Sequence, residues 1–229
     1  MKKVLSGLFV AACLATSSLA AWAVHVTEAD PAHFKLEFEN DAVKIIRADW
    51  GPKESFAGML ELGDIVAVRL APANFRVTLP DGKRVDRASN LGAALYSPAS
   101  KIGVENLQEH RVISVLVELK GKGGAGNANL PKIDPLTSDP THHHLVLEND
   151  KVRVLRVTFG PGQGAPGFFD AAAAVIVPLT PMHFEVTTLD GKKAYTRLTF
   201  GQAVWQPAGR ILPKNLSDMH AEFIVVEPK

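Results

Sequence analysis

A tandem repeat constrains this chain more than any motif in it. Residues 30–120 and 139–229 align without a gap, at a constant offset of 139 − 30 = 109 positions. About a third of the aligned positions are identical, which is more than chance periodicity explains. The identical pairs include Asp30/Asp139, His33/His142, Arg47/Arg156, Phe75/Phe184, Asp81/Asp190, Asn106/Asn215 and Glu118/Glu227. We therefore expect two copies of one domain of about 90 residues each, too few copies for a solenoid.

The N-terminal residues 1–23 have the pattern of a secretory signal peptide. Lys2 and Lys3 precede an apolar stretch, and Ala21-Trp22-Ala23 has the small-x-small pattern that a signal peptidase cuts. We expect cleavage after Ala23 and a periplasmic or secreted mature protein. An uncleaved membrane anchor is disfavoured because the apolar run is short. A lipoprotein acylated at Cys13 is a minority option, because apolar residues follow this cysteine where a polar tether is expected.

Composition excludes several kinds of chemistry from the mature chain. Cys13 is the only cysteine, so cleavage after Ala23 leaves no disulfide, thiolate nucleophile or Cys-ligated zinc. Two lysines leave with the leader, so 25 − 2 = 23 basic residues face 24 acidic ones. This balance offers no electrostatic footprint for nucleic acid or for an anionic membrane surface. A Gly-rich stretch, 121–138, is expected to be an exposed linker between a first domain (24–120) and a second (139–229).

Short apolar runs separated by turn residues predict β-strands in both copies. The runs are 42–46, 65–70, 75–79 and 112–117, and then 152–157, 174–179, 184–189 and 222–226. Asp81-Gly82 and Asp190-Gly191 are typical hairpin dipeptides, because glycine adopts positive φ without steric cost. We predict an all-β fold of two barrels or jelly rolls, filled by inward aliphatic side chains. The two copies are expected to pack as a pseudo-twofold pair through apolar edges.

Several segments resemble the cupin family. Both copies contain Glu-Asn-Asp-x-Val-x-(Val/Ile)-(Leu/Ile)-Arg, followed by Gly-Pro, Asp-Gly-Lys, Pro-Ala and Asn-Leu. Each copy resembles a small single-domain cupin, and the pair resembles a bicupin. The resemblance implies two tandem cupin-type double-stranded β-helix (jelly-roll) barrels. It also implies the place of a metal site, since catalytic cupins usually carry His-x-His and a further histidine that bind one divalent metal inside the barrel.

The histidines of that metal site are absent here. Carried over residue by residue, the motif falls on Met59, Glu61 and Ile102 in the first copy, and on Phe168, Asp170 and Ile211 in the second. We therefore expect no cofactor and treat these six residues as candidates for a ligand pocket. Glu61 and Asp170 occupy the same slot. They are either pocket carboxylates or carboxylates that are solvated or paired with a neighbouring Arg or Lys, and the second interpretation is favoured.

Other candidates lie outside the motif. His142 and His144 form a His-x-His that suggests a surface metal site, but an exposed polar first strand is favoured, with His33 and His142 in a capping or interdomain contact. His183 lies at a strand start, and its orientation is open. Trp205 precedes a Pro-Ala turn, where it either stacks on a ligand or, as favoured, belongs to the core.

Two functional hypotheses follow. The favoured one is a periplasmic bicupin without catalysis, a structural module or one that binds a small organic ligand, because isoleucine or phenylalanine in place of imidazole removes metal ligation. The alternative is an oxygenase- or isomerase-like cupin enzyme. It would hold a divalent metal through unorthodox ligands such as His183 or His142, or work without metal through Asp170 or Glu61 as acid/base. Association into a homo-oligomer is left open.

Overall fold

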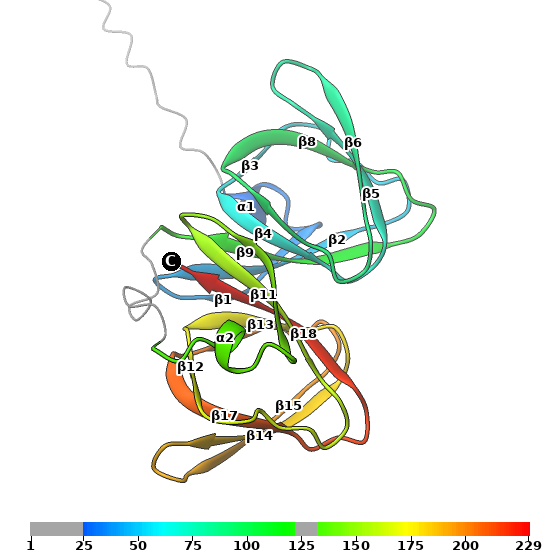
Figure 1. The fold of residues 1–229 in the computed structure, drawn as a ribbon. Coiled ribbons are helices and arrows are strands. Elements are labelled where there is room, and N and C mark those ends of the chain that lie inside the picture. The colour runs from blue at the N-terminus through cyan, green and yellow to red at the C-terminus, as the bar shows by residue number, and fades with distance from the viewer. Residues whose placement is uncertain (1–24, 122–131) are drawn as a thin grey trace, which may run out of the picture.

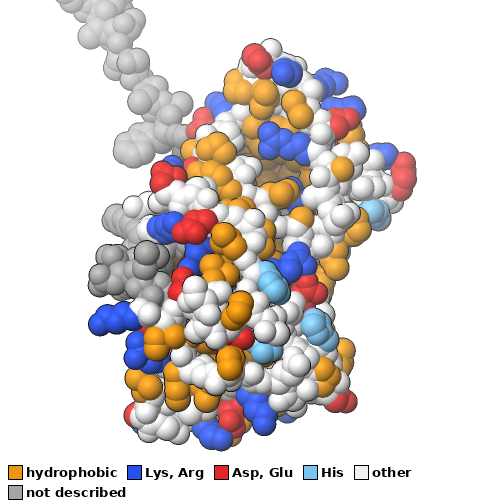
Figure 2. Space-filling model, viewed as in Figure 1, with side chains coloured by type: hydrophobic (Ala, Val, Ile, Leu, Met, Phe, Trp, Pro, Cys, Tyr) orange, Lys and Arg blue, Asp and Glu red, His pale blue; other side chains and the backbone are white. Residues whose placement is uncertain are grey.

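The computed structural model describes residues 25–121 and 132–229, which form two β-barrels, one from each copy of the repeat (Figure 1). The leader with Ala23 and Cys13, and most of the Gly-rich linker, lie outside the described residues, so the predictions made for them stay predictions. Within the two described ranges, no helix has the length and hydropathy of a membrane span. On the face shown in Figure 2, basic and acidic side chains are interspersed.

The first barrel combines a five-stranded and a four-stranded sheet, in the orders β1-β2-β9-β4-β7 and β3-β8-β5-β6. A one-turn helix precedes them. The elements are α1 (Val26–Ala29), β1 (Phe34–Glu39), β2 (Val43–Trp50), β3 (Leu60–Leu62), β4 (Asp64–Arg69), β5 (Ala73–Thr78), β6 (Arg84–Ser89), β7 (Ala94–Ser97), β8 (Ser100–Asn106) and β9 (Val112–Leu119).

The second barrel repeats this arrangement, with sheets β10-β11-β18-β13-β16 and β12-β17-β14-β15. Its elements are α2 (Pro135–Ser138), β10 (His143–Glu148), β11 (Val152–Phe159), β12 (Phe169–Ala171), β13 (Ala174–Pro178), β14 (Met182–Thr188), β15 (Lys193–Leu198), β16 (Val204–Gln206), β17 (Gly209–Asn215) and β18 (Ala221–Pro228).

The second repeat begins earlier than the sequence suggested. Helix α2 lies 135 − 26 = 109 positions after α1, so it obeys the repeat offset. The predicted linker ended at residue 138, but Ile133 accepts a hydrogen bond from the backbone N–H of Asp170 at 3.0 Å. This is a correction: residues 132–138 belong to the second barrel.

The predicted strands are confirmed. Each apolar run lies wholly or largely in a strand, and all the strand pairs are antiparallel. The hairpins β5–β6 and β14–β15 turn at Gly82 and Gly191, whose φ angles are 82° and 78°. The all-β expectation is therefore confirmed, and the described helices are only one turn long.

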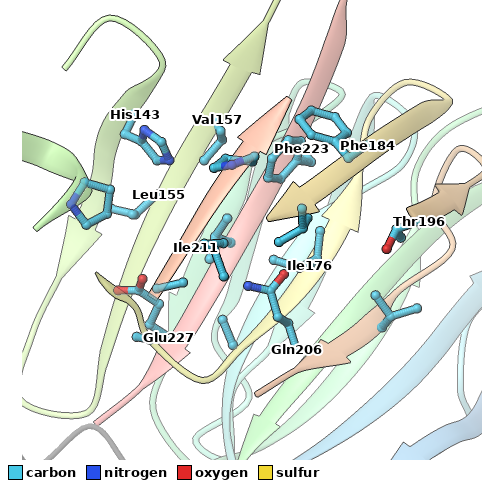
Figure 3. Close-up of a pocket in the computed structure, with 18 of the residues that line it drawn as sticks. His143, Leu155, Val157, Ile176, Phe184, Thr196, Gln206, Ile211, Phe223 and Glu227 are labelled. Carbon is cyan, nitrogen blue, oxygen red and sulfur yellow. The ribbon is translucent and has the colours of Figure 1, made fainter. Parts of the chain in front are cut away.

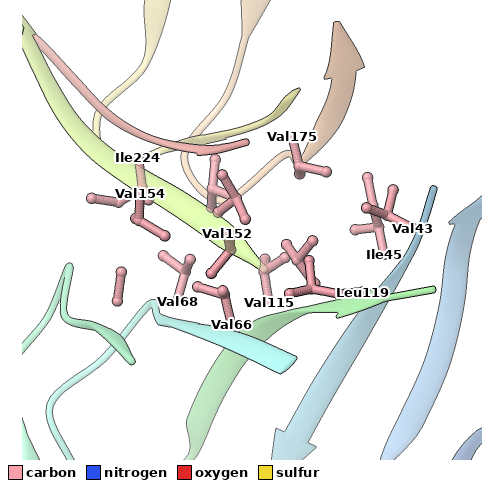
Figure 4. Packing of buried hydrophobic residues seen from close by; sticks show 14 of the residues in the cluster. Val43, Ile45, Val66, Val68, Val115, Leu119, Val152, Val154, Val175 and Ile224 are labelled. Carbon is pink, nitrogen blue, oxygen red and sulfur yellow. The ribbon is translucent and has the colours of Figure 1, made fainter. Parts of the chain in front are cut away.

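The two barrels pack face to face through their five-stranded sheets. Figure 4 shows the shared cluster, in which Val43, Val66 and Val115 of the first barrel meet Val152 and Val175 of the second. The central strands of these sheets (β2, β4 and β9; β11, β13 and β18) are buried on both faces, which explains their nearly continuous apolar runs. The expectation of packing through sheet edges was wrong, because the apolar side chains on the outer faces need a cover and the opposite sheet provides it.

Reciprocal contacts relate the barrels by a pseudo-twofold. Arg47 in β2 donates to the carbonyl oxygen of Gly201 at 2.8 Å, and its repeat equivalent Arg156 in β11 donates to the carbonyl oxygen of Gly92 at 2.6 Å. Both glycines have positive φ, 74° at Gly92 and 70° at Gly201. The same pair of contacts therefore fastens each barrel to a turn of the other.

Candidate functional site

The second barrel encloses a cavity of about 290 Å³ between its two sheets (Figure 3). Most of the lining is apolar, from strands of both sheets and from α2. The apolar lining comprises Pro135, Leu155, Val157, Phe159, Phe169, Ala171, Ala172, Ala174, Ile176, Met182, Phe184, Val186, Leu198, Val204, Trp205, Pro207, Ile211, Pro213, Phe223 and Val225. A molecule held there would lie mainly against hydrocarbon and aromatic side chains.

Strand alternation builds this lining. In β11, Leu155, Val157 and Phe159 face the cavity, whereas Val152 and Val154 belong to the cluster shared with the first barrel. Successive side chains of a strand point to opposite faces, so one strand serves the cavity and the interface between barrels together. The same alternation holds in β13 and β18.

Glu227 is one of the polar groups of the cavity, and its charge is compensated. It lies directly opposite Arg153 in the β11–β18 pair, and Nε of Arg153 donates to its carboxylate. Arg153 also donates to Oδ2 of Asp134 at 2.6 Å. Burial raises the pKa of Glu227. This end of the cavity therefore presents a buried ion pair, in which Glu227 already has a hydrogen-bond donor.

His143 is a second polar group, and the sequence analysis did not single it out. It is 6% exposed, and its ring packs edge-on against Phe159 and Phe169, with centroid distances of 6.1 and 5.0 Å. Its Nδ1 lies 3.2 Å from the carbonyl oxygen of Asp139. Burial lowers the pKa of His143. The repeat could have predicted this burial, because His143 aligns with Phe34, an apolar residue at the start of the first strand.

His142 has a different role from its neighbour. Its ring stacks on Phe159 at 4.1 Å, and its Nδ1 lies 2.6 Å from Oδ1 of Asp139. In the first barrel the ring of His33 likewise stacks on Trp50 at 4.1 Å, and its Nδ1 lies 2.7 Å from Oδ2 of Asp30. His142 is buried while His144 is exposed. The expected exposed strand therefore begins only at His144, and the structure does not bring His142 and His144 together as a surface metal site.

Two of the predicted pocket residues line the cavity. Ile211 and Trp205 are part of it. Phe168 is half-buried and is not among the lining residues, because β12 directs Phe169 and Ala171 inward, with Phe169 paired to Ile211. The carried-over motif was thus displaced by one residue, and a shift of one residue moves every side chain of a strand to the other face.

The carboxylates of the shared motif slot point away from the interiors. Asp170 forms a bidentate ion pair with Arg210, at 2.5 and 2.9 Å, and accepts the backbone N–H of Ile133 at 3.1 Å. The hydrogen bonds from Arg210 hold the pKa of Asp170 down at about 2. Glu61 forms a solvent-exposed ion pair with Lys101 at 2.9 Å. The pocket interpretation is therefore corrected for both carboxylates, and the paired interpretation describes them.

The remaining candidates also lie outside the cavity. Met59 is half-buried and precedes Leu60, which faces the interior of the first barrel opposite Ile102. Ile102 packs against that interior cluster. His183 lies between two cavity-lining residues of β14, so the alternation of the strand directs it away from the cavity.

The residues around the cavity do not fit the divalent metal that cupin enzymes hold. His143 is the one imidazole among the lining residues, and Glu227 is the one carboxylate, already bonded to Arg153. In residues 25–121 and 132–229 there is no group of three or more His, Cys, Asp or Glu side chains placed to share a metal ion. A first-row metal needs several such ligands at one point.

Comparisons with known proteins identify the fold. No family model and no curated protein sequence match the chain. Among solved structures, AerE from Microcystis aeruginosa has a TM-score of 0.61 at 10% identity, over 86% of this chain and 91% of that one.

Two further structures share the architecture. Procruciferin, an 11S globulin from Brassica napus, has a TM-score of 0.58 at 11% identity, over 81% of this chain and 75% of that one. A variant of salicylate 1,2-dioxygenase from Pseudoaminobacter salicylatoxidans has 0.54 at 10%, over 82% and 71%. These likenesses confirm two cupin-type barrels, and their differing names show that the fold alone does not decide an activity.

Proposed function

From the bicupin fold and the cavity inside its second barrel, we propose that this protein is an exported binding protein without catalysis. The second barrel holds one small, largely apolar organic molecule, and the first barrel serves as its structural partner. The observation that carries the proposal is the apolar cavity of about 290 Å³. Apolar cavities bind apolar guests because the guest leaves water and gains contacts with the walls.

The cavity volume sets the size of the ligand. A cavity of about 150 Å³ lined by aliphatic and aromatic residues binds benzene, so one of about 290 Å³ takes a guest of about 12 non-hydrogen atoms. A substituted naphthalene has this size. At roughly 0.6 kcal/mol for each non-hydrogen atom, such a guest should bind with a dissociation constant on the order of 10 μM.

The interior of the first barrel is occupied differently. Ser114 stands at the position of Phe223, and the space beside it is taken by Arg69, which donates to the Ser114 hydroxyl at 2.9 Å. The guanidinium of Arg69 also lies over the Phe75 ring, 4.8 Å from its centroid, and burial lowers the pKa of Arg69 to about 10. This plug supports placing the ligand in the second barrel.

Titration of the mature chain, 24–229, with 2-methylnaphthalene and 2-naphthol tests the proposal. Trp205 lines the cavity, so its fluorescence should change, and calorimetry should give one molecule bound per chain. Absence of saturable binding by both probes would refute a ligand cavity, and turnover of a bound probe would refute the absence of catalysis. Fractionation and N-terminal sequencing test export: the expected mature terminus is Val24, and a chain still starting at Met1 would contradict it.

A further inference from the structure

We infer that the molecule held in the second barrel carries a hydroxyl group that donates a hydrogen bond to Nε2 of His143. The ligand class is then an apolar alcohol or phenol, with its ring or chain against the apolar walls. This inference rests on the proposed function and adds a specificity-determining residue to it.

The hydrogen bonding of His143 fixes which ring nitrogen is available. A neutral imidazole has one N–H donor and one acceptor nitrogen. The carbonyl oxygen of Asp139 lies 3.2 Å from Nδ1, and since a carbonyl only accepts, the proton of the neutral ring belongs on Nδ1. Nε2 is then an acceptor, and it makes no hydrogen bond to any residue in the described ranges.

The surroundings of His143 leave a bound ligand as the source of a donor for Nε2. The side chain is buried and contributes to the cavity wall (Figure 3). Its aromatic neighbours Phe159 and Phe169 offer no conventional hydrogen-bond donor. Burial lowers the pKa of His143, which favours the neutral ring. A guest that fills the cavity would shut this acceptor off from water, which costs free energy unless the guest supplies a donor. A ligand hydroxyl does so and a hydrocarbon does not.

The chain itself supplies a matched comparison for this histidine. The repeat equivalent of His143 is Phe34, which is buried in the interior cluster of the first barrel. A phenylalanine is therefore compatible with this position of the fold. The histidine belongs to the barrel with the apolar cavity, whereas the barrel plugged by Arg69 has a residue without an acceptor there.

The test compares 2-naphthol with 2-methylnaphthalene, two probes of equal size that differ by hydroxyl against methyl. Affinities for both are measured on the wild type and on His143→Phe, at neutral pH. We expect the ratio of the two association constants to shift against 2-naphthol by about tenfold or more in the variant, because an unpaired hydroxyl is then buried. His183→Phe, the same exchange at a position of β14 that is directed away from the cavity, is the control that should leave the ratio unchanged.

The outcomes separate this inference from the function on which it rests. If neither probe binds the wild type, the proposed function fails. If both bind and His143→Phe leaves their ratio unchanged, the cavity stands and the role of His143 is refuted. Circular dichroism checks that the variant folds, and His143→Leu, which also lacks an acceptor, replaces it if it does not.

Discussion

An exchange of Ala174 and its repeat equivalent Ile65 would test whether the second barrel is hollow. Ala174 in β13 lines the cavity, and Ile65 in β4 is buried in the interior cluster of the first barrel. Ala174→Ile adds three carbons to free space, worth up to about 2.4 kcal/mol at ~0.8 kcal/mol for each buried methylene. Strain from imperfect fit offsets part of this gain, so we expect the free energy of unfolding to rise by about 0 to 2 kcal/mol.

The reverse substitution is the matched control. Ile65→Ala removes the same three carbons from a packed interior, and such deletions cost about 2–5 kcal/mol, since a cavity remains. The sign of the effect should therefore differ between the two barrels, although the side chains exchanged are the same.

Urea unfolding followed by tryptophan fluorescence and circular dichroism measures both effects, and the slope against urea must be unchanged for the comparison to hold. Ala174→Ile should also weaken the binding of 2-naphthol by about tenfold, because it fills space the ligand needs. Loss of more than 2 kcal/mol in Ala174→Ile would show that the position is already packed. Unchanged affinity in that variant would place the ligand elsewhere.

Three further predictions concern the ion pairs, the contact between barrels and pH. Asp170→Asn should cost about 1–2 kcal/mol of unfolding free energy because it breaks a bidentate pair, whereas Glu61→Gln, in an exposed pair, should change it by less than about 0.5 kcal/mol in the same urea titration. Gly201→Ala should lower the free energy of unfolding by about 3 kcal/mol, because its Cβ would lie 2.6 Å from a leucine Cδ1 of the first barrel. Gly191→Ala, at a similar φ but in open space, should lower it by about 1 kcal/mol. Equal losses in the two variants would contradict the close approach at Gly201. Burial lowers the pKa of His143 in the folded protein, so as the pH falls this histidine is protonated in the unfolded chain before it is protonated in the folded one. The free energy of unfolding should therefore decrease as the pH drops below about 6.5, and His143→Phe should reduce this dependence on pH.

The fold could be predicted because the same pattern of strands and turns occurs in both copies of the repeat. Asn106 and Asn215, identical in the two copies, show why some positions repeat. Each side chain is fully buried, donates to two or three backbone carbonyl oxygens and accepts one backbone N–H, which ties the loop before the last strand to the end of the second strand. Among side chains, only the amides of Asn and Gln combine an NH₂ donor with a carbonyl acceptor, and in both copies the shorter amide occupies the position. Such positions are recognisable in sequence because the backbone requires them.

The cavity could not be predicted in the same way, because it depends on strand register. Phe168, Phe169 and Asp170 are adjacent, and the sequence does not state which of them faces inward. Cross-strand pairing of Phe169 with Ile211 decides it. The volume of the cavity also depends on the sizes of many side chains together. A small residue such as Ala174 leaves a cavity only if no larger side chain across the barrel fills the space beside it.

The two barrels differ most where neither fold nor interface constrains them. Arg47 and Arg156 are retained because each fastens a turn of the opposite barrel, and both copies must meet that requirement. The fold requires only that each interior be filled, and we propose that an arginine fills it in one copy and a bound molecule in the other. His143 is then the residue whose chemistry the scaffold does not require, since a phenylalanine occupies the same position in the first barrel. Its Nε2, an acceptor in an apolar wall that no donor of the described residues reaches, is best explained by a ligand that supplies the donor.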